Sequence, residues 1–145
     1  MVRGKQFFGV ALVLLLAGCD PEPAYMGRPA SAWRRDLKHK DSMARCHAVA
    51  VFAVIRPPVK EVIPDLIACL RDHVHYVRHE AAVALSTMGP DAKAAVPSLL
   101  ELTKDPHPKV REAAVSALKR IDPEAAAKAE ALQSDEETQR QGDEG

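Results

Sequence analysis

The sequence predicts an all-α fold, an α-α superhelix of about three helix-hairpin repeats with a capping helix at the carboxyl end. The first observation behind this prediction is a period of 33 residues along the chain of 145 residues. The period separates residues of the same type, namely Arg45, Arg78 and Arg111, Pro57, Pro90 and Pro123, Pro64 and Pro97, and Asp72 and Asp105. Such a period is typical of a solenoid, in which each unit buries its apolar face against its neighbours. The second observation is the helical spacing of apolar residues inside each period, without the alternation of a strand.

Residues 1–18 have the pattern of an export signal. Arg3 and Lys5 precede an apolar run that is too short to span a bilayer as a helix. The run ends in Leu16-Ala17-Gly18-Cys19, which resembles the lipobox of bacterial lipoproteins. The resemblance implies a lipoprotein signal peptide and a mature chain that starts at Cys19, with lipid on its sulfur and its amino group. An ordinary secretory signal with an incidental cysteine is the alternative.

Lipid at Cys19 would place the chain at the cell membrane, facing outside the cytoplasm. In some double-membraned bacteria an aspartate at the next position, here Asp20, is a signal for retention in the inner membrane, which would put this chain on its periplasmic side. Residues 19–28 are expected to be an extended tether, because Pro21 and Pro23 disfavour a helix. About ten residues at about 3.3 Å each can lift a domain some 30 Å from the membrane.

The first repeat is expected over residues 29–56. Trp33 occupies the position that leucine fills in the later repeats, at Leu66 and Leu99. Because this terminal unit has no predecessor, we interpret Trp33 and Leu37 as a broad apolar lid that closes the stack.

The second and third repeats are expected over residues 57–89 and 90–122, each with two amphipathic helices. The apolar faces of the second repeat consist of Val62, Ile63, Leu66, Ile67 and Leu70, and then of Val77, Ala81, Ala84, Leu85 and Met88. Those of the third repeat consist of Val96, Leu99 and Leu100, and then of Val110, Ala114, Ala117, Leu118 and Ile121. Such spacing keeps the apolar side chains on one face of each helix. The segment Gly89-Pro90-Asp91 ends one repeat and begins the next.

A cap helix is expected over residues 123–132. Asp122-Pro123-Glu124 supplies an N-cap, a first-turn proline and a first-turn acid. A cap with a polar outer side keeps the end of a stack soluble. Residues 133–145 lack apolar periodicity and are predicted to be a disordered acidic tail. The acidic residues of this tail are Asp135, Glu136, Glu137, Asp143 and Glu144.

Two stretches, Met88–Leu100 and Lys104–Leu118, resemble HEAT repeats, close to the short bacterial type also grouped with bilin-lyase-like repeats. The resemblance covers about residues 27–122. It implies an aspartate in the turn between the paired helices and an arginine six residues later, which form a ladder between neighbouring units. The residues with this spacing are Asp72 with Arg78 and Asp105 with Arg111. In the first unit His39 stands where the aspartate would be, which leaves the contact of Arg45 open.

These features predict a membrane-anchored scaffold or adaptor for an unknown protein partner at the bacterial cell envelope, and no enzyme, cofactor or metal. The binding face is expected on the concave side, formed by the second helix of each pair. The candidate residues are Cys46, His79, Ala82, Ser86, Glu112, Ser116 and Lys119. Because this face is mixed in charge and poor in aromatic anchors, we expect modest affinity, strengthened by confinement at the membrane.

The alternative is an enzyme or enzyme subunit of the HEAT class, either metal-dependent and hydroxylase-like or bilin-lyase-like. His75, His79 and Glu80 could hold a metal ion, since the two histidines are one helical turn apart. His79-Glu80 also resembles the His-Glu signature of deoxyhypusine hydroxylase. The resemblance implies several such pairs, one in each of the facing repeats. In the first and third repeats the same positions hold Cys46-His47 and Glu112-Ala113, so only one His-Glu pair exists and the implied ligand set is incomplete.

The cysteines and the basic residues of the first repeat have structural interpretations that are favoured over functional ones. Cys46 and Cys69 could form a disulfide after export, but two cysteines do not make a framework, and free apolar thiols are favoured. Arg34, Arg35, Lys38 and Lys40 form a basic cluster that is more often a solvated helix face than a lipid contact. The predicted export and the absence of a strong basic surplus both argue against nucleic acid as a partner, and none is expected.

Overall fold

The structure, a computed structural model, describes residues 23–56 and 58–131. The predicted signal peptide (1–18), the predicted lipid-attachment residue Cys19 and the predicted acidic tail (133–145) lie outside this part of the chain. In the described part the predicted all-α superhelix is confirmed.

Three helical hairpins follow one another along the chain. Their paired helices are α2 (Ala30–Asp36) and α3 (Ser42–Val54), α4 (Ile63–Cys69) and α5 (His75–Met88), and α6 (Val96–Leu102) and α7 (Pro108–Ile121). Short 3-10 helices, η1 (Lys60–Val62) and η2 (Gly89–Ala95), precede α4 and α6. Residues 123–131 are helical and form the cap helix.

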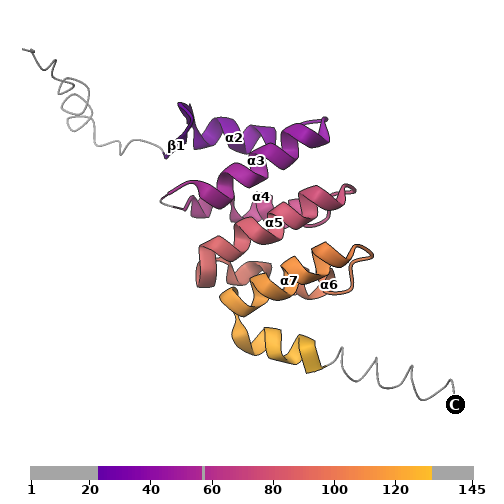
Figure 1. Cartoon of the computed structure of the whole chain (residues 1–145). Coiled ribbons are helices and arrows are strands. Elements are labelled where there is room, and N and C mark those ends of the chain that lie inside the picture. The colour runs from indigo at the N-terminus through magenta and orange to yellow at the C-terminus, as the bar shows by residue number, and fades with distance from the viewer. Residues whose placement is uncertain (1–22, 57, 132–145) are drawn as a thin grey trace, which may run out of the picture.

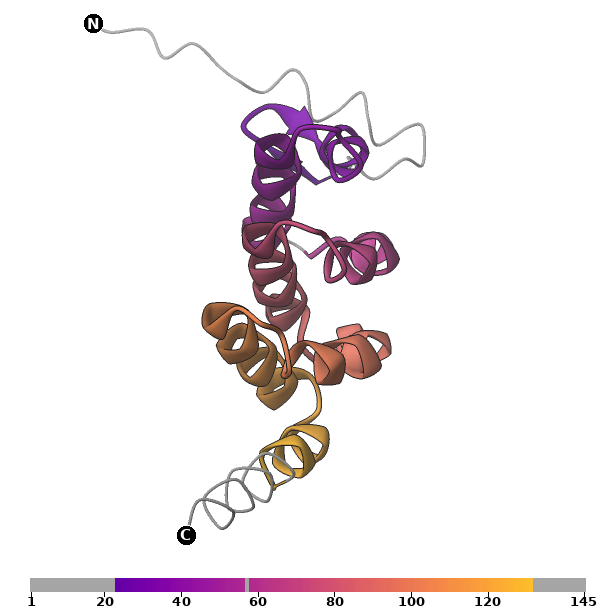
Figure 2. The ribbon, with the colours of Figure 1, turned by 90° about the vertical axis from the view of Figure 1, so that its right-hand side faces the viewer.

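The hairpins are stacked so that their first and second helices form two layers. Figure 2 shows α3, α5 and α7 along one side of the stack and α2, α4 and α6 along the other. Within the second layer α5 packs against both α3 and α7. The turns between paired helices all lie at the same edge of the molecule (Figure 1).

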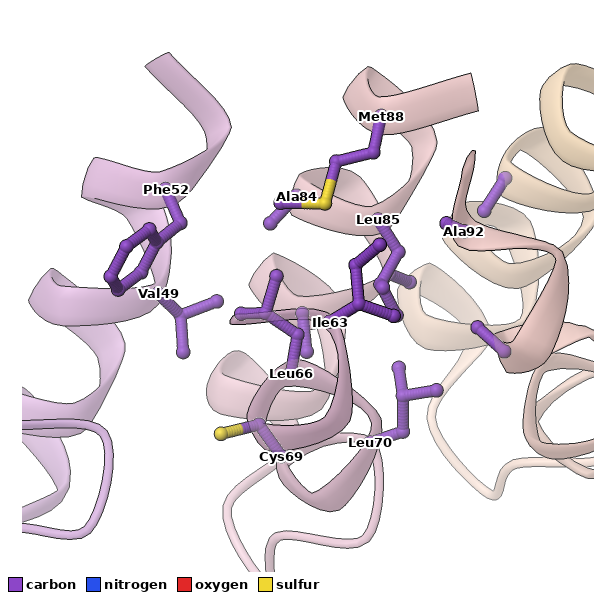
Figure 3. Close-up of a cluster of buried hydrophobic side chains, with 14 of the residues drawn as sticks. Val49, Phe52, Ile63, Leu66, Cys69, Leu70, Ala84, Leu85, Met88 and Ala92 are labelled. Carbon is purple, nitrogen blue, oxygen red and sulfur yellow. The ribbon is translucent and has the colours of Figure 1, made fainter. Parts of the chain in front are cut away.

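The core runs continuously through the stack because each hairpin contributes apolar side chains to both of its neighbours. Val49 and Phe52 of α3, Leu66 of α4 and Leu85 and Met88 of α5 belong to one buried cluster (Figure 3). Alanine recurs at one position of the second helices, where the equivalent Ala48, Ala81 and Ala114 are completely buried. Alanine allows the helices to approach closely while retaining high helix propensity.

The helix ends use the residues that local chemistry favours. The Asp41 side chain accepts hydrogen bonds from the backbone amides of Met43 and Ala44 and caps α3. Gly89 ends α5 with a φ of 58°, a region that favours glycine. Proline lies in the first turn of α4, α6 and α7, where its missing N–H costs nothing.

The end of the predicted tether is folded, which corrects the expectation of an extended segment over residues 19–28. Strand β1 (Ala24–Tyr25) pairs antiparallel with β2 (Arg28–Pro29). Met26 and Gly27 both have positive φ, as a two-residue type I′ turn requires. The indole Nε1 of Trp33 donates a hydrogen bond to the carbonyl oxygen of Tyr25 at 3.4 Å, which joins the β-hairpin to α2.

Trp33 and Leu37 are buried at the start of the stack, but they are not its outermost surface. The guanidinium of Arg28 lies 4.0 Å from the centre of the Trp33 ring, and its Nη2 is 2.9 Å from the carboxylate of Asp36. A cation over an indole face is favourable. The β-hairpin therefore covers the tryptophan that was expected, together with Leu37, to close the stack.

None of the helices in residues 23–56 and 58–131 combines the length and the hydrophobicity needed to cross a bilayer.

Candidate functional site

Two arginines join neighbouring hairpins through paired hydrogen bonds to a carboxylate. Arg45 donates to Asp72 through Nε at 2.7 Å and Nη2 at 2.9 Å. Arg78 donates to Asp105 in the same way, at 2.8 Å and 3.0 Å. Both contacts are bidentate, the strong form of an arginine–carboxylate pair. They fix the position of each second helix relative to the turn of the next hairpin.

The residue six positions before each arginine contributes its backbone carbonyl rather than its side chain. Nη1 of Arg45 donates to the carbonyl oxygen of His39 at 2.9 Å, and Nη1 of Arg78 to that of Asp72 at 2.8 Å. A carbonyl is present whatever the side chain, so the histidine in the first unit does not prevent the contact. Each arginine therefore has two kinds of partner. The residue six positions before it accepts through its backbone carbonyl within the same hairpin. The carboxylate that it binds belongs to the next hairpin, 27 residues after the arginine.

A groove of about 340 Å³ lies between α5 and α7 on the side formed by the second helices. It is lined by His79, Val83, Ser86, Lys109, Glu112, Ala113 and Ser116. Four of the candidate binding residues, His79, Ser86, Glu112 and Ser116, are therefore brought together in this α5–α7 groove. Cys46 is half-buried on α3, and Lys119 is exposed on α7 with its Nζ 2.7 Å from a carboxylate oxygen of Glu130.

Ala82 was expected on the binding face, and this expectation is wrong because its side chain is completely buried. The equivalent residue of the first hairpin, Val49, is also completely buried, whereas Val115 in the last hairpin is half-buried. Since only the last copy of this position is partly exposed, it faces the next hairpin rather than solvent.

Tyr76 and Met43 are exposed residues that the sequence analysis missed. The side chains are 62% and 74% exposed, and the two residues occupy the same position in successive hairpins. Tyr76 is three and seven residues before His79 and Val83, so it lies on the same face of α5 as the groove. Met43, Tyr76 and Lys109 stand 33 residues apart and so occupy the same position of the three repeats. This spacing could have identified Met43 and Tyr76 as surface residues, because a lysine at the same position is usually exposed. This surface was expected to be poor in aromatic anchors, and Tyr76 places one exposed aromatic side chain beside the groove.

The comparisons with known proteins identify the repeats. A family model described as HEAT repeats matches residues 31–119, more than half of the chain. The chain belongs to the HEAT repeat family. A crystal structure of an engineered protein is similar to this HEAT protein, with a TM-score of 0.56 and 25% sequence identity. The similarity covers 71% of this chain and 52% of the engineered chain, so this chain spans about half of that protein's length. No curated protein matches the chain.

HEAT repeats indicate a helical scaffold for protein interaction, and the family together with the engineered neighbour favours a scaffold without enzymatic activity. The candidate metal ligands of the alternative hypothesis are not gathered. The ring of His75 stacks on that of His107 at 4.0 Å, while Nδ1 of His79 contacts Glu80 at 3.1 Å. Within the described residues no three histidine, cysteine or acidic side chains are placed to hold a metal ion.

Both cysteines of the HEAT domain are free thiols. Burial raises the pKa of Cys69 to about 11 and also raises the pKa of Cys46. A thiol with a raised pKa forms little thiolate and reacts slowly. The two residues therefore act as small packing groups in this structure.

The basic cluster of the first hairpin is partly engaged inside the stack. Nε of Arg34 and Nζ of Lys38 contact the two carboxylate oxygens of Asp65 on α4, at 2.5 Å and 3.0 Å. These contacts join the first helices of neighbouring HEAT hairpins. They add a second set of charge pairs on the opposite layer from the arginine ladder.

The ladder carboxylates have lowered pKa values. Burial acts to raise the pKa of Asp72 and of Asp105, but hydrogen bonds from Arg45 and Arg78 and from backbone amides outweigh it. The folded state therefore holds these groups in the charged form. Their contribution to stability is present above the unfolded-state pKa, near the reference value of 3.8, and is lost as pH falls through the lower folded-state pKa.

We predict that the free energy of unfolding falls as pH is lowered below about 4, because Asp72 and Asp105 must then be protonated. Urea denaturation, followed by helical circular dichroism between neutral pH and pH of about 2.5, measures this dependence. The Asp72→Asn variant should start from a lower stability and lose less of it over the acidic range. A wild-type stability that stays constant throughout this range would contradict the prediction.

Proposed function

We propose that this HEAT protein is a membrane-anchored scaffold or adaptor that holds a protein partner at the bacterial cell envelope. The observation that carries the proposal is the α5–α7 groove, which lies beside the exposed Tyr76 on the layer of second helices. Its central residues belong to two different hairpins, so the stacking of the units creates the surface.

The groove has the chemistry of a protein-binding surface with modest affinity. Tyr76 and Val83 provide apolar contact at the α5 side, whereas Lys109 and Glu112 of α7 provide charges of both signs. This arrangement fits a helix or extended segment with an apolar side chain next to polar or charged ones. One aromatic anchor gives limited binding energy. Confinement of both proteins to one membrane raises the effective concentration and strengthens such binding.

The binding surface can be tested by site-specific photo-crosslinking in cells. A photoreactive residue at Ser116, inside the groove, is expected to crosslink a discrete protein, whereas one at the exposed Ala68 on α4 is not. Tyr76→Ala should weaken this crosslink about tenfold or more, as loss of an aromatic anchor does. The matched control is Tyr25→Ala, which removes the other tyrosine of the chain. Equal crosslinking from Ser116 and Ala68, or no effect of Tyr76→Ala, would contradict the proposed surface.

The membrane anchor is supported by the basic start, the apolar run and the terminal Leu16-Ala17-Gly18-Cys19. We predict that Cys19→Ser moves the protein from the membrane fraction to the soluble fraction, because the sulfur that would accept lipid is lost. Cell fractionation and intact mass spectrometry measure the change. A wild-type protein that carries no lipid mass would show that the segment is an ordinary signal.

A further inference from the structure

The last hairpin leaves a face without a neighbour among the described residues. In the first two hairpins the ladder arginine binds a carboxylate of the next unit. Within residues 23–56 and 58–131, Arg111 has no carboxylate partner, and its Nη1 donates to the carbonyl oxygens of Asp105 and Pro106. Arg111 is exposed, and Val115 is only half-buried although its equivalents Val49 and Ala82 are completely buried. A hollow of about 480 Å³ marks this α7 end face, which is lined by Pro108, Arg111, Glu112, Val115, Ser116 and Lys119.

We propose that the acidic segment Asp135–Glu137 of this same chain docks on the α7 end face, where one of its carboxylates binds Arg111. The contact would be a third rung of the arginine ladder, made by the tail instead of a fourth hairpin.

The register of the chain supports this occupant. The two formed rungs join residues 27 positions apart, Arg45 to Asp72 and Arg78 to Asp105. The same interval from Arg111 leads to Thr138, directly after Asp135, Glu136 and Glu137. The period thus brings three carboxylates next to the point where the ladder needs one.

The reach of the chain is sufficient. The ion pair between Lys119 and Glu130, at 2.7 Å, fixes the cap helix against α7. Arg111 lies eight residues before Lys119 on α7, which is a distance of about 12 Å along the helix axis. From Glu130 to Glu136 is six residues, which span about 9 Å as a helix and about 20 Å when extended. The cap helix also runs toward the edge of the molecule at which the turns between paired helices lie (Figure 1).

A second copy of the chain fits this face less well. Head-to-tail stacking would present the first hairpin of the next copy, which carries His39 where the later hairpins carry Asp72 and Asp105. The aspartate in that turn, Asp41, stands two residues later than the position of Asp72 and Asp105, and its carboxylate accepts hydrogen bonds from the backbone amides of Met43 and Ala44. The β-hairpin and Arg28 also cover its exposed end. The tail offers the carboxylate that a second copy lacks at this position, and its docking would block end-to-end association of the stacks.

The proposal can be tested by nuclear magnetic resonance on the full mature chain with Cys19→Ser. The exchange of the Arg111 Nε–H with solvent is expected to be about tenfold slower than that of Arg120, as a charge-assisted hydrogen bond predicts. Arg120 is the matched control because it is exposed on the same helix. The combined variant Asp135→Asn, Glu136→Gln and Glu137→Gln should remove this difference, whereas Asp143→Asn with Glu144→Gln should leave it unchanged.

Three results would overturn the proposal. Equal exchange at Arg111 and Arg120 would show that no carboxylate is bound there. Slow exchange that survives neutralisation of Asp135–Glu137 would show a different acceptor. Slow exchange that appears only at high protein concentration would identify a second copy as the occupant. The α7 end face shares Glu112 and Ser116 with the α5–α7 groove. The exchange of the Arg111 Nε–H is nevertheless measured on the purified chain without the partner of the groove, so this experiment can fail while the proposed function stands.

Discussion

Replacement of Arg78 by alanine is expected to lower the free energy of unfolding by about 3–5 kcal/mol, because it leaves a buried carboxylate without its cation. The side chains of Arg78 and Asp105 are only 13% and 6% exposed. The variant also removes the hydrogen bond from Arg78 to the carbonyl oxygen of Asp72. Urea denaturation at neutral pH, followed by helical circular dichroism, measures the change. Because each hairpin needs its neighbours, the loss should appear as a lower midpoint for the whole domain.

The matched control for this prediction is Arg71→Ala. Arg71 also joins two hairpins, with its Nη2 3.3 Å from a carboxylate oxygen of Glu101, but these side chains are 70% and 65% exposed. An exposed ion pair contributes about 0–1 kcal/mol, so this variant should retain nearly all of the stability. If both variants lose the same free energy of unfolding, the ladder contributes no more than an ordinary surface charge pair.

The ladder shows what the sequence could and could not predict about contacts. The repeated aspartates and arginines were evident, and the resemblance to HEAT repeats implied that they join neighbouring units. The spacing between Asp72 and Arg78, however, reports the distance to a backbone carbonyl within one hairpin. Which carboxylate each arginine binds is decided by how the hairpins stack. For this reason the pair of Arg45 with Asp72 became evident only from the structure.

The helices were predictable because their apolar residues recur with the period of a helix over many residues. The N-terminal hairpin gave no such signal, because β1 and β2 contain two residues each and its turn places Met26, which is not glycine, at a positive φ. Ala82 was misplaced for a different reason. A helical period identifies the face that packs on the paired helix, but α5 is also covered by α3 and α7.

Replacement of Leu85 by alanine is expected to lower the free energy of unfolding by about 2–5 kcal/mol, because it removes buried methyl groups and leaves a cavity. Leu85 is completely buried in the cluster that also contains Leu66, Leu70 and Ala92 (Figure 3). Leu85→Met keeps the volume and should cost less than about 1.5 kcal/mol. Leu100→Ala is the exposed control, since Leu100 is partly open to solvent. Equal losses for Leu85→Ala and Leu100→Ala in urea denaturation would contradict this account of the core.

The position of Leu85 in the central hairpin also determines which helices should lose protection from amide hydrogen exchange. Three units are close to the minimum for a stable stack, and each one contacts only its neighbours. Leu85→Ala weakens the one hairpin that both others contact, so amide hydrogen exchange should accelerate together in α3, α5 and α7. The equivalent change in the last hairpin, Leu118→Ala, should accelerate exchange mainly in α6 and α7, because α3 keeps its contacts with α5. Uniform acceleration by both variants would instead indicate that the domain unfolds only as a single unit.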